Sequence, residues 1–138
     1  MLMKTNHWLV KQEPDSYSWA TFAREKRTAW EGVRNYQARN NLKAMAAGDP
    51  GLFYASGEAK AVIGLAEVSK PAFPDITADE LGWVAVELKA VRALAHPVTL
   101  AQVKADPTLS AIDLVRNSRL SVMPIPGAAF ARIVQLGS

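Results

Sequence analysis

The segment of residues 30–40 gathers the side chains best suited to hold a single nucleobase. Trp30 offers an aromatic plate, and Gly32 lets a ligand approach the backbone closely because it has no side chain. Asn35 can read a base edge and can begin a helix, whose N-terminal amides attract an anion such as phosphate. Arg34 and Arg39 add positive charge. A stacking surface, an edge reader and charge neutralisation are what one extruded base requires.

The same residues also have a purely structural interpretation, which the sequence leaves open. Trp30 would then belong to the core, Asn35 would only cap a helix, and the two arginines would form surface salt bridges. The net charge of the whole chain is only +3, yet residues 24–43 alone carry six basic and two acidic side chains. We therefore expect positive charge to be concentrated in the part of the chain that contains Trp30.

Residues that could catalyse a reaction are few. Glu13 and Asp15 lie two positions apart, which on a strand would place both carboxylates on one face, but Pro14 between them predicts a turn. Ser56 and Ser121 have no histidine or lysine at the spacing of a nucleophile motif, and the glycines form no phosphate-binding loop. We therefore expect that the protein is not an enzyme and has no catalytic residue.

The composition excludes several kinds of site. The chain has no cysteine, which rules out a disulfide scaffold, a thiolate zinc site and a cysteine nucleophile. With only His7 and His96, a histidine-rich metal centre is ruled out too, and we expect neither a metal nor a cofactor. No stretch reaches the roughly eighteen apolar residues of a membrane-spanning helix, and residues 1–6 lack the apolar block of a signal peptide. We expect a cytoplasmic monomer with no membrane partner.

The elements that must position residues 30–40 follow from apolar periodicity. The 138 residues, 49% of them apolar, predict a single domain over residues 1–138. Runs of apolar residues predict strands at 8–10, 52–55, 61–68, 83–92 and 120–123. Ser18, Asn35 and Thr99 as N-caps, with helical spacing, predict helices at 19–25, 36–47 and 100–106. Further helices are expected at 110–116 and with Pro126 as a first residue, while residues 30–34 are expected in a loop. Five or six strands with short helices between them predict an α+β fold, and a small closed or half-closed barrel would hide most strand edges.

Five blocks of the sequence resemble the EVE domain family, and they occur in the same order. The blocks are residues 8–15, 30–41, 52–56, 63–68 and 117–124. The resemblance implies a PUA-like fold, a mixed β-barrel of five or six strands with flanking short helices. It also implies a non-enzymatic reader that accommodates a flipped modified base, chiefly a modified cytosine such as 5-methylcytosine in DNA. The open alternatives are an RNA-binding module that recognises structured or modified RNA, and a small-metabolite-binding protein or enzyme that uses the same pocket.

The resemblance further implies which positions surround the base. They come from the end of the first strand, from the segment around Trp30, from the strand before residue 56 and from the last predicted strand: Lys11, Gln12, Trp30, Gly32, Val33, Arg34, Asn35, Tyr54, Ser56, Ser121, Val122 and Met123. Arg39 joins the predicted site because of its charge. Several of them also have a structural interpretation. Tyr54 and Met123 would be core residues, and the two serines would bond to the backbone.

The chain departs from the family pattern in several places. Gln12 stands where serine is common, Ala55 replaces a frequent histidine, and Pro50 with Gly51 interrupts the apolar entry to a strand. The connection over residues 72–82 is shorter than in many members. Because a missing insertion would open one wall of the pocket, the preference for a particular base does not follow from the fold.

Overall fold

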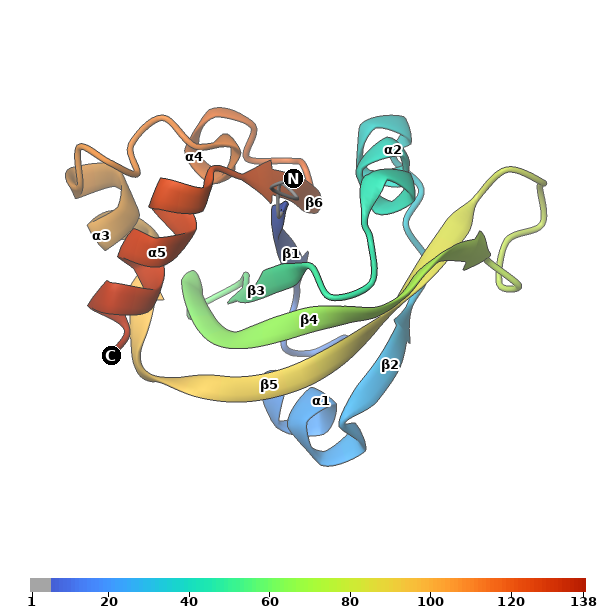
Figure 1. The fold of residues 1–138 in the computed structure, drawn as a ribbon, viewed down its shortest axis with the longest axis horizontal. Helices are drawn as coiled ribbons and strands as arrows, with labels where there is room; N and C mark the ends of the chain where they lie inside the picture. The colour runs from blue at the N-terminus through green and yellow to red at the C-terminus, as the bar shows by residue number, and fades with distance from the viewer. Residues whose placement is uncertain (1–5) are drawn as a thin grey trace, which may run out of the picture.

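The computed structural model describes residues 6–138, which form six strands and five short helices (Figure 1). The strands are β1 (His7–Gln12), β2 (Arg27–Trp30), β3 (Pro50–Ala55), β4 (Ala61–Pro74), β5 (Val84–Thr99) and β6 (Val122–Ile125). The helices are α1 (Trp19–Glu25), α2 (Tyr36–Ala44), α3 (Leu100–Ala105), α4 (Asp113–Arg116) and α5 (Gly127–Leu136). The expectation of no signal peptide concerned residues 1–6, of which only Asn6 is described. None of the helices within residues 6–138 has the length and apolar character needed to cross a membrane.

The strands make one mixed sheet with the order β2-β5-β4-β3-β1-β6. Strands β1 and β3 run parallel, and the other four neighbouring pairs of this sheet are antiparallel. The long pair β4 and β5 shifts register at several points, and such bulges bend a strand and increase its twist. Figure 1 shows the result, in which β4 and β5 sweep in a curve around the other strands. The predicted α+β class is confirmed, and the six strands agree with the predicted five or six.

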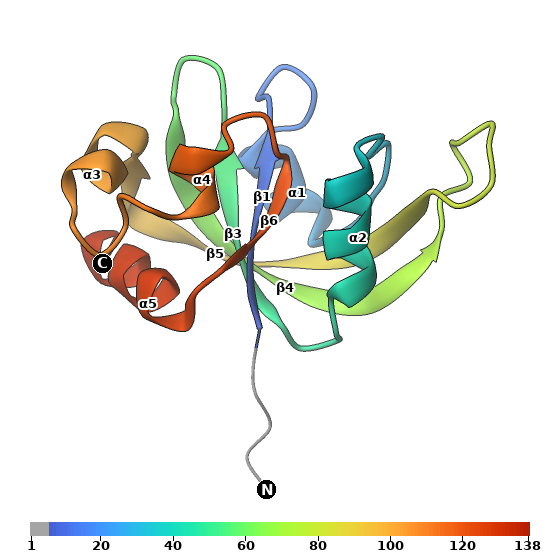
Figure 2. The same ribbon diagram turned by 90° about the horizontal axis from the view of Figure 1, so that it is seen from above.

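Helices α3, α4 and α5 lie on one side of β1, and α2 lies on the other (Figure 2). Figure 2 shows α3, α4 and α5 gathered at one end of the molecule, whereas α2 lies toward the other end, beside the projecting hairpin of β4 and β5. The predicted caps account for where several helices begin. The Ser18 hydroxyl accepts from the Thr21 amide, the Asn35 side chain accepts from the Ala38 amide, and Thr99 forms a capping box with Gln102.

A cluster of aromatic rings holds α1 against the sheet, on strands β2 and β3. Phe22 of α1 is fully buried and stacks on Phe53 of β3, with 5.8 Å between ring centroids. Trp19 packs edge-on against both rings at 5.4 and 5.5 Å. Trp30 at the end of β2 meets Phe53 edge-on at 5.9 Å. This packing places the end of β2 beside α1 and β3.

The structure corrects the expected position of Trp30. This residue closes strand β2 and is only 4% exposed, whereas the sequence predicted it in an open loop. Strand β2 has four residues, three of them not buried, so it carries no apolar run that would reveal it. It forms because Arg27 to Trp30 pair with the edge of β5.

Other boundaries moved by a few residues. Helix α2 ends at Ala44 instead of residue 47, because the Asp49 carboxylate accepts from the Ala46 amide and stabilises a turn there. Pro126 is the N-cap of α5 and not its first helical residue. Strands β4 and β5 run on to Pro74 and Thr99, beyond the ends predicted for them.

Candidate functional site

A hollow of about 280 Å³ lies beside Trp30, where four segments of the chain meet. We call it the Trp30 hollow. Its lining comes from the end of β1, the turn before α1, the end of α1 and strand β2: Gln12, Tyr17, Glu25, Thr28, Ala29, Trp30 and Glu31. Of the predicted site residues, the structure brings Gln12 and Trp30 together here.

The two aromatic rings that line the Trp30 hollow differ in how far they are exposed. The Trp30 ring is almost wholly buried against the core, so only part of it borders the hollow. Tyr17 is half-buried, and its ring meets the Trp30 ring edge-on at 6.1 Å. The Tyr17 hydroxyl donates a hydrogen bond of 2.5 Å to Glu25 Oε1. Burial, and then this bond, raise the pKa of Tyr17, so the phenol stays protonated at neutral pH.

The loop after Trp30 is fixed by a carboxylate that the sequence analysis did not single out. Asp75 Oδ2 accepts from the Gly32 amide at 2.8 Å and from Arg34 Nη1 at 2.9 Å. Asp75 Oδ1 accepts from the amide and hydroxyl of Thr77 at 2.8 and 2.6 Å. Burial by itself would raise the pKa of Asp75, but the hydrogen bonds from Thr77, Arg34 and Gly32 outweigh it and hold the pKa well below its usual range. The one sequence signal was Asp-x-Thr, typical of a side-chain turn.

Two aromatic rings and two guanidinium groups form a stacked surface beside that loop. Tyr36, which is 67% exposed, stacks on Trp83 with 5.2 Å between centroids and 22° between planes. The Arg39 guanidinium carbon lies 5.0 Å from the Tyr36 centroid and 5.5 Å from the Trp83 centroid. Arg34 lies 5.6 Å from the Trp83 centroid. We call Tyr36, Trp83 and Arg39 the stacked platform. Trp83 was expected only as part of a strand.

The residues predicted near the end of β1 form a separate group that positions this strand. Lys11 Nζ donates to the Ser118 carbonyl at 2.7 Å and lies 5.8 Å from the Tyr54 ring centroid. Burial lowers the pKa of Lys11 and raises that of Tyr54. The Ser56 amide and hydroxyl both donate to the Gln12 carbonyl, and the Ser121 carbonyl accepts from the Lys11 amide. These bonds use backbone groups and fix the end of β1 beside the Trp30 hollow.

The remaining predicted residues do not line the Trp30 hollow. Tyr54 is 3% exposed, and Val122 and Met123 are fully buried, so the structure places all three in the core. Val33 is half-buried and packs against the core, and the oxygen of the Asn35 side chain is used by the helix cap. Five lining residues were missed by the sequence analysis: Tyr17, Glu25, Thr28, Ala29 and Glu31.

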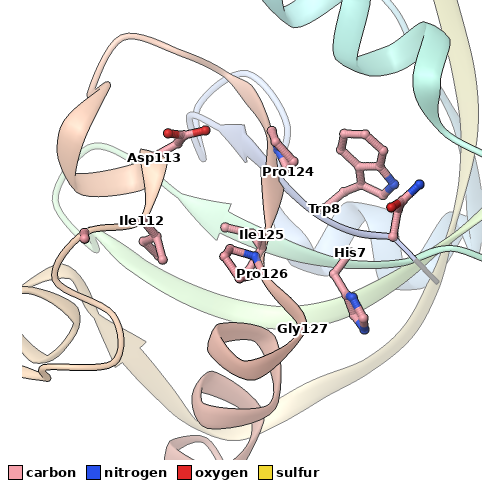
Figure 3. A pocket seen from close by; sticks show the side chains of 10 residues that line it. His7, Trp8, Ile112, Asp113, Pro124, Ile125, Pro126 and Gly127 are labelled. Carbon is pink, nitrogen blue, oxygen red and sulfur yellow. The ribbon is translucent and has the colours of Figure 1, made fainter. Parts of the chain in front are cut away.

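A larger hollow of about 410 Å³ lies between β1, β6 and the first turns of α4 and α5 (Figure 3). None of the predicted site residues lines it. Its aromatic ring, Trp8, is 4% exposed and donates its indole N–H to the buried Asp49 carboxylate at 2.9 Å. Figure 3 shows His7 and Asp113 on opposite sides of this hollow. The Trp30 hollow is the better candidate site, because it joins two of the predicted residues, Gln12 and Trp30, to exposed hydrogen-bonding groups.

Comparison with known proteins decides the relationship. The model of the EVE domain matches residues 6–136. The chain belongs to the EVE domain family. The predicted membership and the PUA-like fold are thereby confirmed.

Individual relatives of this EVE domain cover nearly all of it. Thymocyte nuclear protein 1 of Mus musculus is 32% identical over 166 residues, which include 96% of this chain and 74% of that protein. A crystal structure of a protein from Agrobacterium tumefaciens is 42% identical with a TM-score of 0.94, covering 97% of this chain and 94% of that one. Human THYN1, solved in complex with 5-methylcytosine containing DNA, is 30% identical with a TM-score of 0.90. That match covers 97% of this chain and 98% of the human one.

Proposed function

We propose that this EVE domain binds nucleic acid without catalysing a reaction, and that the Trp30 hollow accepts one flipped, modified base. The first candidate is 5-methylcytosine in DNA. The observation that carries the proposal is the Trp30 hollow itself, which joins an aromatic lining to several hydrogen-bonding side chains. The similarity to human THYN1, whose structure contains DNA with 5-methylcytosine, supports DNA as the partner.

The aromatic side chains of the Trp30 hollow suit a flat heterocycle. Stacking of a base on an aromatic ring contributes about 1–3 kcal/mol. Tyr17 is the more accessible of the two rings, whereas only part of the Trp30 indole borders the hollow. We therefore assign the main stacking contact to Tyr17 and the floor of the hollow to Trp30.

Basic side chains flank the hollow and are available for phosphates. Arg24 and Lys26 adjoin Glu25 in the chain, and Arg27 adjoins Thr28; all three are exposed. None of the three forms an ion pair with another residue in 6–138. Arg34, by contrast, is paired with Asp75. We assign the phosphate contacts mainly to Arg24, Lys26 and Arg27, with Arg39 of the stacked platform as a further cation.

The test is to fill the Trp30 hollow without disturbing the core. Trp30→Ala is unsuitable because it would remove a buried indole from the core, which costs about 3–5 kcal/mol of stability. Ala29→Phe adds a ring at an exposed lining position instead. Ala95→Phe, at an exposed position on β5 away from this lining, is the matched control.

The measurement is fluorescence anisotropy with duplexes that differ at one cytosine, which is unmodified, 5-methylated or 5-hydroxymethylated. We expect the wild-type protein and Ala95→Phe to bind a modified duplex more tightly, and Ala29→Phe to lose that preference. Equal affinity of the wild-type protein for all three duplexes would defeat the proposal. Competition with RNA of the same sequence decides between the two nucleic acids, and tighter binding of RNA would replace DNA in the assignment.

A further inference from the structure

The polar lining of the Trp30 hollow is rich in hydrogen-bond acceptors. Two of its side chains are carboxylates, Glu25 from the end of α1 and Glu31 directly after β2. An ionised carboxylate can accept hydrogen bonds but cannot donate one. The other polar side chains are Gln12, Tyr17 and Thr28. A ligand that bonds to these two carboxylates must therefore offer donors.

The two carboxylates are not equally free. Glu25 already accepts a hydrogen bond from the Tyr17 hydroxyl. The same bond uses the hydroxyl hydrogen of Tyr17, so Tyr17 cannot donate it to a ligand. Glu31 is exposed and makes neither an ion pair nor a side-chain hydrogen bond with any residue in 6–138. Glu31 follows Trp30 in the chain and is itself one of the residues that line the same hollow. Glu31 is the acceptor available to a ligand.

Pyrimidine bases differ at the position that such an acceptor would test. Cytosine carries an N4 amino group, which donates, whereas thymine and uracil carry O4, which accepts. A carboxylate bonds to the amino group and repels the carbonyl oxygen, and Glu is an established partner of cytosine N4 for this reason. The Gln12 amide can donate to the ring nitrogen or carbonyl that cytosine offers beside its amino group.

We propose that Glu31 is a specificity-determining residue that makes the Trp30 hollow select bases with an exocyclic amino group at this edge, and reject thymine and uracil. The inference rests on the proposed function, since it assumes that a flipped base enters the hollow. 5-Methylcytosine and thymine share the ring and the 5-methyl group. They differ at the 4-position and at N3, which accepts in cytosine and carries a hydrogen in thymine, so the change in their relative affinities on substitution of Glu31 measures the contribution of this acceptor.

The experiment removes base pairing as a variable. Two duplexes carry either 5-methylcytosine or thymine opposite an abasic site, so that neither base has to break a pair before it flips. Fluorescence anisotropy titrations give both affinities for the wild-type protein, for Glu31→Gln and for the matched control Glu58→Gln, an exposed glutamate outside the hollow. We expect the wild-type protein and Glu58→Gln to favour 5-methylcytosine by about tenfold or more. Glu31→Gln should bind both within about threefold, because an amide can also donate.

Two results would overturn the inference while leaving the proposed function intact. One is a wild-type preference that Glu31→Gln keeps unchanged, which would assign the discrimination to another group. The other is equal binding of both bases by the wild-type protein while Ala29→Phe weakens both. If Ala29→Phe changes nothing and no duplex is preferred, the proposed function itself fails. Glu31 is exposed and makes no side-chain bond within residues 6–138, so the variant should keep its thermal stability, which circular dichroism verifies.

Discussion

Asp75 shapes the loop that follows the candidate base site. Its two carboxylate oxygens accept four hydrogen bonds, from the Gly32 amide, from Arg34 and from the amide and hydroxyl of Thr77. Gly32 has φ +81°, a conformation that glycine adopts without strain. The carboxylate therefore joins the loop after β2 to the hairpin of β4 and β5. Its ion pair with Arg34 also neutralises much of the charge of that side chain.

We expect Asp75→Asn to lower the free energy of unfolding by about 1–3 kcal/mol at pH 7, because a buried charged acceptor of several bonds is lost. The effect should depend on pH. Since the pKa of Asp75 is depressed in the folded state, its stabilisation is complete about one pH unit above the ordinary pKa of about 3.9, and it is lost progressively as the pH falls from there toward the depressed pKa of the folded state. Thermal unfolding from pH 7 to pH 3 should show a Tm gap between the two proteins that is constant to about pH 5 and then narrows.

Asp79→Asn is the control for this prediction, because Asp79 is an exposed carboxylate of the same hairpin. Its effect should stay within about 0.5 kcal/mol. A Tm gap for Asp75→Asn that is as wide at pH 3 as at pH 7 would contradict the role assigned to the ionised carboxylate.

At the scale of elements, the contact between α1 and β4 depends on a glycine. A Cβ atom added to Gly64 would lie 2.5 to 2.7 Å from three atoms of the Trp19 ring. The ring therefore packs directly on the backbone of β4, while it also meets Phe22 and Phe53 edge-on. Because α1 carries Glu25 into the Trp30 hollow, this packing also positions part of the site.

Gly64→Ala should destabilise the protein by about 1–3 kcal/mol through overpacking. Gly51→Ala on β3 is the matched control, because its added Cβ would have ordinary contacts of 3.6 Å or more. Urea unfolding measures both. Adding Trp19→Phe to Gly64→Ala should recover part of the loss, since the smaller ring lacks the atoms that collide. Equal stability of the two alanine variants would show that Trp19 moves aside freely.

The sequence predicted those elements whose signals are local. Three helix starts were predicted correctly from the N-caps Ser18, Asn35 and Thr99, because a cap acts within one turn of its own helix. Strand β2 was missed because only its pairing with β5 makes it a strand. The extensions of β4 and β5 were missed for a related reason, since bulges interrupt the alternation of apolar residues on which strand prediction depends.

At the scale of the whole molecule, the candidate site was only partly predictable. Gln12 and Trp30 were named because they belong to recognisable sequence blocks. Tyr17 precedes α1 and Glu25 is its last residue. They line the Trp30 hollow together with β2 only because the chain turns back sharply at Lys26, which has φ +70°. The turn at Lys26 brings segments with no shared sequence pattern into one lining. The full lining of the Trp30 hollow could therefore be found only from the three-dimensional structure.

The distribution of charge over the molecule leads to the last prediction. Arg27 lies opposite Lys89 in the pairing of β2 with β5, and it forms no ion pair within residues 6–138. Two like charges face each other across these strands, so removing one should not destabilise the fold. If Arg27 contacts a phosphate, Arg27→Gln should weaken binding to modified and unmodified duplexes alike.

The decisive quantity is the dependence of affinity on salt. Each phosphate contact contributes about 0.9 to the slope of log K against log salt concentration, because it releases condensed counterions. Arg27→Gln should therefore reduce the magnitude of the slope by about one, while the ratio between modified and unmodified DNA is preserved. Lys104→Gln on α3, at the opposite end of the molecule from β2 (Figure 1), removes the same charge and should leave the slope unchanged. Equal changes in both variants would mean that net charge alone governs binding and that no phosphate lies beside β2.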